Sequence, residues 1–125
     1  MIVIDSDQVL VHISTKDFSF VAEQHLSEIF DKLNKYNLKV NMMRNTAISF
    51  SVAVQNRPNR ILKFIEDLSR DYNILRDDNL ELITVRHYDD ATVDRMKKGK
   101  IVLFEETFRQ TVRMAVKDIP LVVRK

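Results

Sequence analysis

The 125-residue sequence contains no cysteine, no tryptophan, two prolines and a single glycine. Without cysteine the chain can form no disulfide and no Cys-type zinc site, and it has no thiolate nucleophile. With Gly99 as its one glycine it can form neither a P-loop nor a GxGxxG turn, because both need several glycines for close approach to phosphate. These absences exclude the common nucleotide-binding motifs and are typical of a cytoplasmic protein.

Excess charge and long hydrophobic runs are missing as well. The 20 Lys and Arg residues nearly balance the 18 Asp and Glu residues, which leaves a net charge of +2 and no strong field for nucleic acid. The longest apolar runs are about five residues, far short of a membrane span, and no basic region precedes the N-terminal Met1–Ile4 to make a signal peptide. We therefore expect neither a membrane nor a nucleic-acid partner.

Hydrophobic residues make up 45% of the sequence, and their spacing alternates between the patterns of strands and of helices. Residues 9–13 alternate as a strand. Apolar residues then recur at helical spacing over 22–33, with Asp17 or Ser19 available as the N-cap. Strands are predicted over 38–43 and 47–54.

A turn at 44–46 should join those two strands, and Pro58 marks the start of a second helix. The later elements are shorter: a strand at 73–76, a turn at 77–79, a strand at 80–87, a helix from Asp89 or Asp90 to Met96 that stops at Gly99, and strands at 100–104 and 108–116. The order β-α-β-β-α-β, followed by an abbreviated copy, predicts an α+β fold of the ferredoxin-like type. In such a fold antiparallel sheets carry helices on one face.

The polar residues form no recognisable catalytic or metal-binding set. His12, His25 and His87 make no HxxxH pair, and Ser49 and Ser51 have no histidine near them in sequence. We therefore expect no catalytic residue, no metal and no cofactor.

Two polar clusters leave alternatives open. The segment 87–90 could hold magnesium or an acid and base pair, although a helix cap explains it more simply. The basic residues of 97–100, with Arg57 and Arg60, could bind phosphate or could lie at solvated helix ends.

One face of the predicted strand 47–54 carries only small side chains. Because small side chains project little, such a face allows another protein surface to approach closely. Because the helices should cover only the opposite face of the sheet, we predict a dimer interface at Ser49, Ser51 and Ala53.

Several segments resemble the tandem ACT domains at the C-terminus of aspartate kinases. The segments similar to the first ACT domain are Val11–Ser14, Ser27–Phe30, Tyr36–Met43 and Ala47–Val52, and Leu80–Val85 resembles the opening strand of the second. The resemblance runs from about Gln8 to Lys117 and is most specific over Asn37–Met43. It implies a first ACT domain at 8–77 and a second, shortened ACT-like unit at 78–125.

The resemblance also implies an allosteric role in the biosynthesis of aspartate-family amino acids. Such domains bind an end-product amino acid, lysine or threonine, pair as homodimers and regulate a kinase domain in the same parent chain. Effector binding is then expected at the loop after the first strand and at the second strand with its turn: Thr15, Lys16, Asp17, Phe18, Ser19, Val40, Asn41, Met42, Asn45 and Thr46.

A purely structural dimerisation module, without effector binding, is the alternative hypothesis. It needs only the sheet and the small-residue face.

Overall fold

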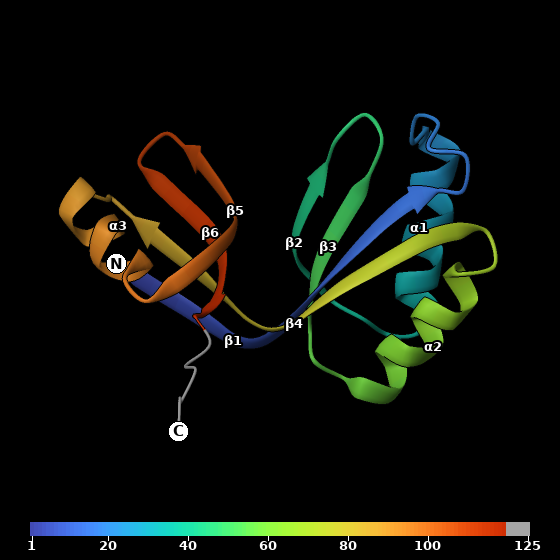
Figure 1. Ribbon diagram of the computed structural model, residues 1–125, viewed down its shortest axis with the longest axis horizontal. Helices are drawn as coiled ribbons and strands as arrows, with labels where there is room; N and C mark the ends of the chain where they lie inside the picture. The colour runs from blue at the N-terminus through green and yellow to red at the C-terminus, as the bar shows by residue number, and fades with distance from the viewer. Residues whose placement is uncertain (120–125) are drawn as a thin grey trace, which may run out of the picture. The chain divides into compact units, whose positions relative to one another are not determined.

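The computed structural model describes residues 1–119, and the chain divides into two compact units. The central unit is Gln8–Asp78, and the split unit combines Met1–Asp7 with the chain from Asn79 onward. Two long strands, β1 (Ile2–Thr15) and β4 (Tyr72–Arg86), each contribute one half to either unit (Figure 1). That the first domain ends near residue 77 stays a prediction.

The central unit has the predicted β-α-β-β-α-β order. Between its halves of β1 and β4 it contains α1 (Glu23–Lys35), β2 (Val40–Asn45), β3 (Phe50–Gln55) and α2 (Pro58–Leu68). The strands are hydrogen-bonded in the order β2-β3-β1-β4, and β3 is antiparallel to both β1 and β2. This is the ferredoxin-like arrangement, so the predicted α+β fold is confirmed.

Every element of the central unit contributes to one hydrophobic core. The helices α1 and α2 lie on one side of the sheet (Figure 1). Their buried apolar residues form a stripe on each helix that packs into this core. Pro58 opens α2 at its first turn, as predicted. The buried residues of this core are Val9, Val11, Ile13, Ile29, Leu33, Leu38, Phe50, Val52, Val54, Ile61, Phe64, Leu68 and Tyr72.

The split unit uses one short helix, α3 (Asp90–Lys97), and two further strands, β5 (Lys100–Phe108) and β6 (Thr111–Asp118). Its strand order is β1-β4-β6-β5. The predicted helix cap is confirmed, since an Asp89 carboxylate oxygen accepts a hydrogen bond from the Thr92 N–H at 2.7 Å. Gly99 follows α3 with φ +75°, a conformation that glycine adopts without strain.

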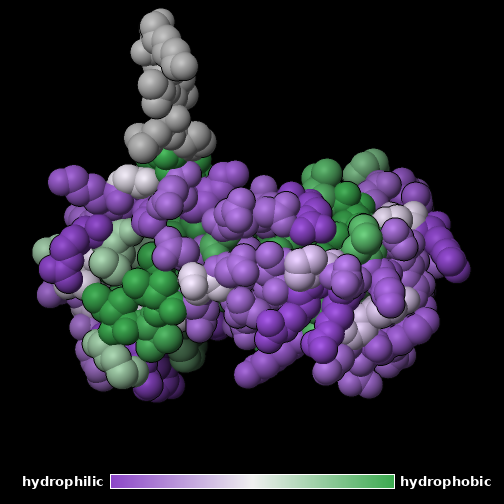
Figure 2. All heavy atoms as spheres, turned by 90° about the horizontal axis from the view of Figure 1, so that it is seen from below, coloured by the Kyte–Doolittle hydropathy of each residue, from purple (hydrophilic) through white to green (hydrophobic). Residues whose placement is uncertain are grey.

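The core of the split unit is smaller: Ile83, Val85, Val93, Val112, Met114 and Val116. At its N-terminus, Met1 and the first three residues of β1, Ile2, Val3 and Ile4, remain exposed, with Ile2 at 38% and Ile4 at 49%. Figure 2 shows hydrophobic surface on this unit, at the left of the view. One helix of eight residues therefore leaves part of the apolar surface of this unit open to solvent.

Several element boundaries differ from the sequence prediction. The strands β1 and β5 extend beyond the predicted 9–13 and 100–104, and three further differences have a local cause. The first helix starts at Glu23, after Ala22, because Asp17 instead accepts a hydrogen bond from the Ser19 N–H at 3.1 Å and shapes the preceding loop. The turn between β2 and β3 lies at 46–49 rather than 44–46, held by a Thr46 N–H donating to the Ser49 carbonyl at 2.9 Å. The last strand begins at Thr111 and not at Phe108, because a turn with Arg109 at φ 55° intervenes.

The predicted turn at 77–79 is also wrong. The strand β4 continues through these residues, and Asn79 alone takes a left-handed conformation, φ 59°. Asp7 of β1 does the same, φ 52°, and both residues lie where the chain passes from one unit to the other. Asn and Asp tolerate this region better than other non-glycine residues, so the Asp-Asp-Asn pattern marks a local break within a strand.

The sheet face opposite the helices was expected to be free, and it is only partly so. Leu10, Met42 and Ala53 do not belong to the helix-side core of the central unit, yet all three are buried.

Within residues 1–119 no helix is long and apolar enough to cross a membrane.

Candidate functional site

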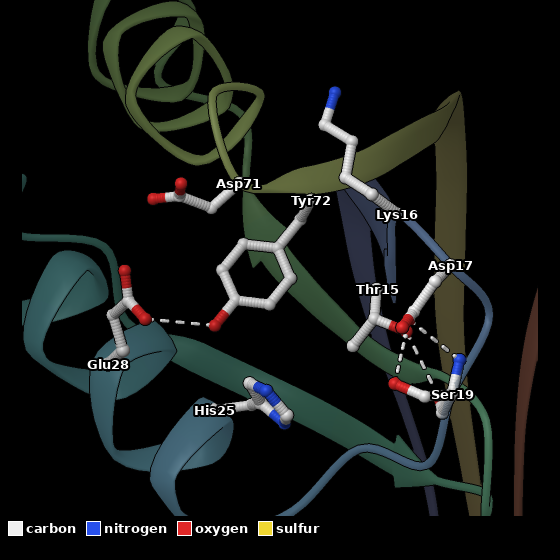
Figure 3. Close-up of a pocket in the computed structure, with 8 residues that line it drawn as sticks. All are labelled: Thr15, Lys16, Asp17, Ser19, His25, Glu28, Asp71 and Tyr72. Carbon is white, nitrogen blue, oxygen red and sulfur yellow. Dashed lines mark hydrogen bonds between the residues drawn. The ribbon is translucent and has the colours of Figure 1, made fainter.

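A pocket of about 440 Å³ lies in the central unit, at the end of β1, the start of β4 and the first turns of α1. We refer to it as the loop pocket. It is lined by Thr15, Lys16, Asp17, Ser19, His25, Glu28, Asp71 and Tyr72. Figure 3 shows the Tyr72 ring between Glu28 on one side and the Thr15–Ser19 loop on the other.

Hydrogen bonds hold the loop side of the pocket. The Thr15 hydroxyl donates to the Ser19 carbonyl at 3.1 Å and lies 3.2 Å from the Ser19 hydroxyl. Hydrogen bonds from the Ser19 side chain and backbone, and from Thr15, hold the pKa of Asp17 below its ordinary value. Asp17 therefore carries its negative charge at neutral pH.

The helix side of the pocket is organised around Tyr72. Its hydroxyl donates to a Glu28 carboxylate oxygen at 2.9 Å, and the His25 ring meets the Tyr72 ring edge-on with centroids 6.0 Å apart. Burial, followed by the hydrogen bond to Glu28, raises the pKa of Tyr72 to about 12. Tyr72 is thus a neutral hydrogen-bond donor at physiological pH.

The charges around the loop pocket are unequal. Three carboxylates, from Asp17, Glu28 and Asp71, face one certain cation, Lys16, and one histidine. An acidic pocket of this size suits a small ligand with a cationic group.

The structure brings four of the predicted effector residues together in this pocket: Thr15, Lys16, Asp17 and Ser19. Phe18 belongs to the same loop but is 65% exposed and does not line the pocket.

Five other predicted effector residues lie elsewhere, on or next to β2: Val40, Asn41, Met42, Asn45 and Thr46. The strand β2 is at the far edge of the order β2-β3-β1-β4, two strands away from β1, so it does not reach the β1–β4 end where the pocket lies. The Asn41 amide donates to the Gln8 side chain at 2.9 Å, Met42 is buried and Thr46 holds the β2–β3 turn. A role for these residues in effector binding stays a prediction.

Sequence reasoning missed His25, Glu28, Asp71 and Tyr72 as lining residues. His25 and Glu28 are three residues apart on α1, a spacing that places both on one helix face. This spacing could have been recognised in the sequence. The approach of β4 to α1 could not, because it depends on pairing between strands that are distant in the sequence.

A second polar cluster crosses the sheet of the central unit. His12 Nδ1 lies 2.9 Å from the Ser51 hydroxyl, and His12 Nε2 lies 2.9 Å from an Asp77 carboxylate oxygen. No histidine is near Ser51 along the chain, but the antiparallel register pairs His12 directly with it. Of the predicted interface residues, Ser51 and Ser49 are partly exposed, whereas Ala53 is fully buried.

Among residues 1–119, no three His, Asp or Glu side chains are grouped so that they could hold a metal ion.

Similar solved structures define the class of fold. A putative C-terminal regulatory domain of aspartate kinase from Porphyromonas gingivalis W83 superposes with a TM-score of 0.74 and 16% identity, over 94% of this chain and 85% of that one. The regulatory subunit of aspartate kinase from Thermus flavus gives 0.67 and 9% identity, over 93% and 86%. The chain has the fold of these aspartate kinase regulatory domains.

Aspartokinase III of E. coli, in complex with lysine and aspartate, gives a TM-score of 0.71 and 12% identity. The alignment covers 93% of this chain but only 29% of that much longer one. No family model matches the sequence, and no curated protein matches it. The fold is therefore established by structure, at sequence identities too low to carry residue roles across.

Proposed function

We propose that this chain is the amino-acid-sensing regulatory region of an aspartate kinase, and that the loop pocket receives the effector. The observation that carries the proposal is the loop pocket itself, which lies beside the loop after β1 and the first turns of α1. It is supported by the likeness of the fold to aspartate kinase regulatory domains. The partner of this chain would be a kinase domain of the same parent protein, and both would act in the cytoplasm. Effector binding would regulate that domain by favouring one of two conformations.

Among the two expected effectors, the charges favour lysine over threonine. Asp17, Glu28 and Asp71 surround a space of about 440 Å³, and a second ammonium group would offset their mutual repulsion. Threonine has a neutral side chain and would leave that repulsion in place. The similar E. coli enzyme was solved with lysine and aspartate bound.

The direct test is calorimetric titration of the chain with lysine, threonine and methionine, combined with thermal unfolding. We expect heat and a rise in melting temperature with lysine, since a ligand at 100 times its Kd stabilises a protein by about 2.7 kcal/mol. An absence of both heat and stabilisation with all three amino acids would rule out the sensor function.

A matched pair of substitutions on α1 locates the site. Glu28→Gln removes one carboxylate from the pocket and weakens the acceptor of the Tyr72 hydroxyl, so lysine affinity should fall by about tenfold. Glu23→Gln makes the same change at an exposed position outside the pocket and should leave the affinity unchanged. Equal losses in both variants would place the ligand elsewhere.

A structural dimerisation module is the second candidate. The polar groups of the loop pocket already bond one another, as Thr15 with Ser19 and Glu28 with Tyr72, so the pocket is stable without a ligand. Dimerisation through Ser49 and Ser51 predicts that Ser51→Arg produces a monomer in sedimentation velocity. A dimer that survives this substitution would place the interface on another face.

A further inference from the structure

A second cleft lies between the helices of the central unit, on the side away from the sheet. It has a volume of about 310 Å³ and is lined by the last turn of α1 with Tyr36, and by the second half of α2 with Arg70. Its residues recur at intervals of three and four on each helix, so their side chains share one face. We call it the helix cleft, and it has no residue in common with the loop pocket.

Asp67 forms the floor of the helix cleft. Its side chain is only 15% exposed, accepts a hydrogen bond from the Tyr36 hydroxyl at 2.5 Å, and pairs with Lys32 at 3.2 Å and Lys35 at 3.5 Å. The hydrogen bonds from Tyr36 and Lys32 lower the pKa of Asp67 to about 2. One carboxylate thus pairs with two ammonium groups, so Asp67, Lys32 and Lys35 together carry a net charge of +1.

The rim adds two further cations. Lys63 and Arg70 are exposed, and neither has a salt bridge to any residue in the part of the chain that the structure describes. Glu66 is the only other carboxylate in the lining, so four cations face two anions. The formal charge of the lining is therefore +2.

We propose that the helix cleft binds the dianionic phosphate group of a small phosphate monoester. Four cationic groups brought into one cleft repel one another, and a group of charge −2 offsets the excess. The guanidinium of Arg70 can donate two parallel hydrogen bonds to phosphate oxygens, while the ammonium groups of Lys63 and Lys35 act as point charges. A volume of about 310 Å³ leaves room for an organic group beside the phosphate.

The test is an amide chemical-shift titration of the chain with inorganic phosphate, glucose 6-phosphate, glucose and succinate, at a pH of about 7.5 where phosphate is mostly dianionic. We expect inorganic phosphate and glucose 6-phosphate to shift amides at the ends of α1 and α2. Glucose should give no shift, and succinate, whose charges are spread over a longer molecule, should bind roughly tenfold more weakly.

Two double variants complete the experiment. Lys63→Ala with Arg70→Ala should weaken phosphate binding by roughly tenfold or more. Lys98→Ala with Arg86→Ala removes the same charge from exposed positions of the split unit and should change the affinity by less than about twofold.

Three results would overturn the proposal: no shifts in the cleft with phosphate up to roughly 50 mM, equal losses in both double variants, or succinate binding as tightly as phosphate. The first excludes a site, the second indicates non-specific attraction, and the third indicates a dicarboxylate site.

Discussion

The two units of the chain use the same strand pattern but cover it unequally. In the central unit two helices of 13 and 11 residues lie on the sheet, and the core includes large side chains such as Phe50 and Phe64. In the split unit a single helix of eight residues covers a smaller core, and Ile2 and Ile4 stay exposed. The loop pocket and the helix cleft both belong to the central unit, whose sheet is covered by the two longer helices.

This difference indicates a division of roles. A ligand site needs side chains held by a packed support, and α1 and α2 provide one for Glu28 and Asp67 alike. The split unit has fewer buried contacts and should open more readily. We therefore expect the central unit to bind ligands and the split unit to be the less stable one.

The largest effect should come from Phe64→Ala in α2. Phe64 is fully buried in the core of the central unit, so its truncation leaves a cavity and should cost about 3–5 kcal/mol of unfolding free energy. Denaturant unfolding followed by circular dichroism measures the loss. Leu62→Ala, at a residue 53% exposed on the same helix, should change stability by less than about 0.5 kcal/mol. Equal costs would contradict the assigned face of α2.

Met114→Ala makes the corresponding change in the split unit. Met114 is fully buried there, and its truncation should cost about 2–3 kcal/mol, at the lower end of such substitutions because the core is small. Hydrogen exchange should show faster opening of β5 and β6, with α1 and α2 less affected. If both core variants accelerate exchange equally in both units, the chain unfolds as one body and the comparison fails.

Asp67→Asn tests the acid side of the stability curve. Because the pKa of Asp67 is depressed to about 2 in the folded protein, its ion pairs stabilise the fold above the ordinary carboxyl pKa of 3.8. That stabilisation is lost as the pH falls from about 4 towards 2. The variant should be less stable than the parent at neutral pH, and the difference should shrink over that interval. A pH-independent difference in urea midpoints would assign the effect to packing.

The smallest expected effect concerns the helix starts. The helix α3 has a side-chain cap from Asp89, whereas α1 begins after Ala22 with no side-chain cap. Ala22→Ser should therefore raise stability by about 0.5–1 kcal/mol. Ala91→Ser, within the first turn of the already capped α3, should bring no gain. A stability increase in both variants would show that capping is not the cause.

Local patterns predicted much of the fold. The helical spacing of Ile61, Phe64 and Leu68, the Pro58 start, the Asp89 cap and the Gly99 stop all lie where sequence rules put them. The first helix start and the 77–79 turn were wrong because Asp and Asn have several local uses. Asp17 shapes a loop, and Asn79 takes a left-handed conformation inside a strand.

The candidate sites were less predictable. Thr15–Ser19 were predicted from the resemblance to ACT domains, whereas Asp71 and Tyr72 lie more than 50 residues later, just before and at the start of β4. The polar cluster around His12 was equally hard to predict. The folded sheet brings Ser51 and Asp77, which are distant in the sequence, within hydrogen-bond distance of the His12 ring.

The sequence by itself determined what this protein lacks and which elements it forms, since cysteine and glycine counts and hydrophobic periodicity are local properties. The tertiary structure decided which charges meet. Strand order separated β2 from the loop pocket, and the packing of α1 against α2 placed Lys32 and Lys35 around Asp67. Such encounters depend on contacts between residues distant in sequence, which no local pattern encodes.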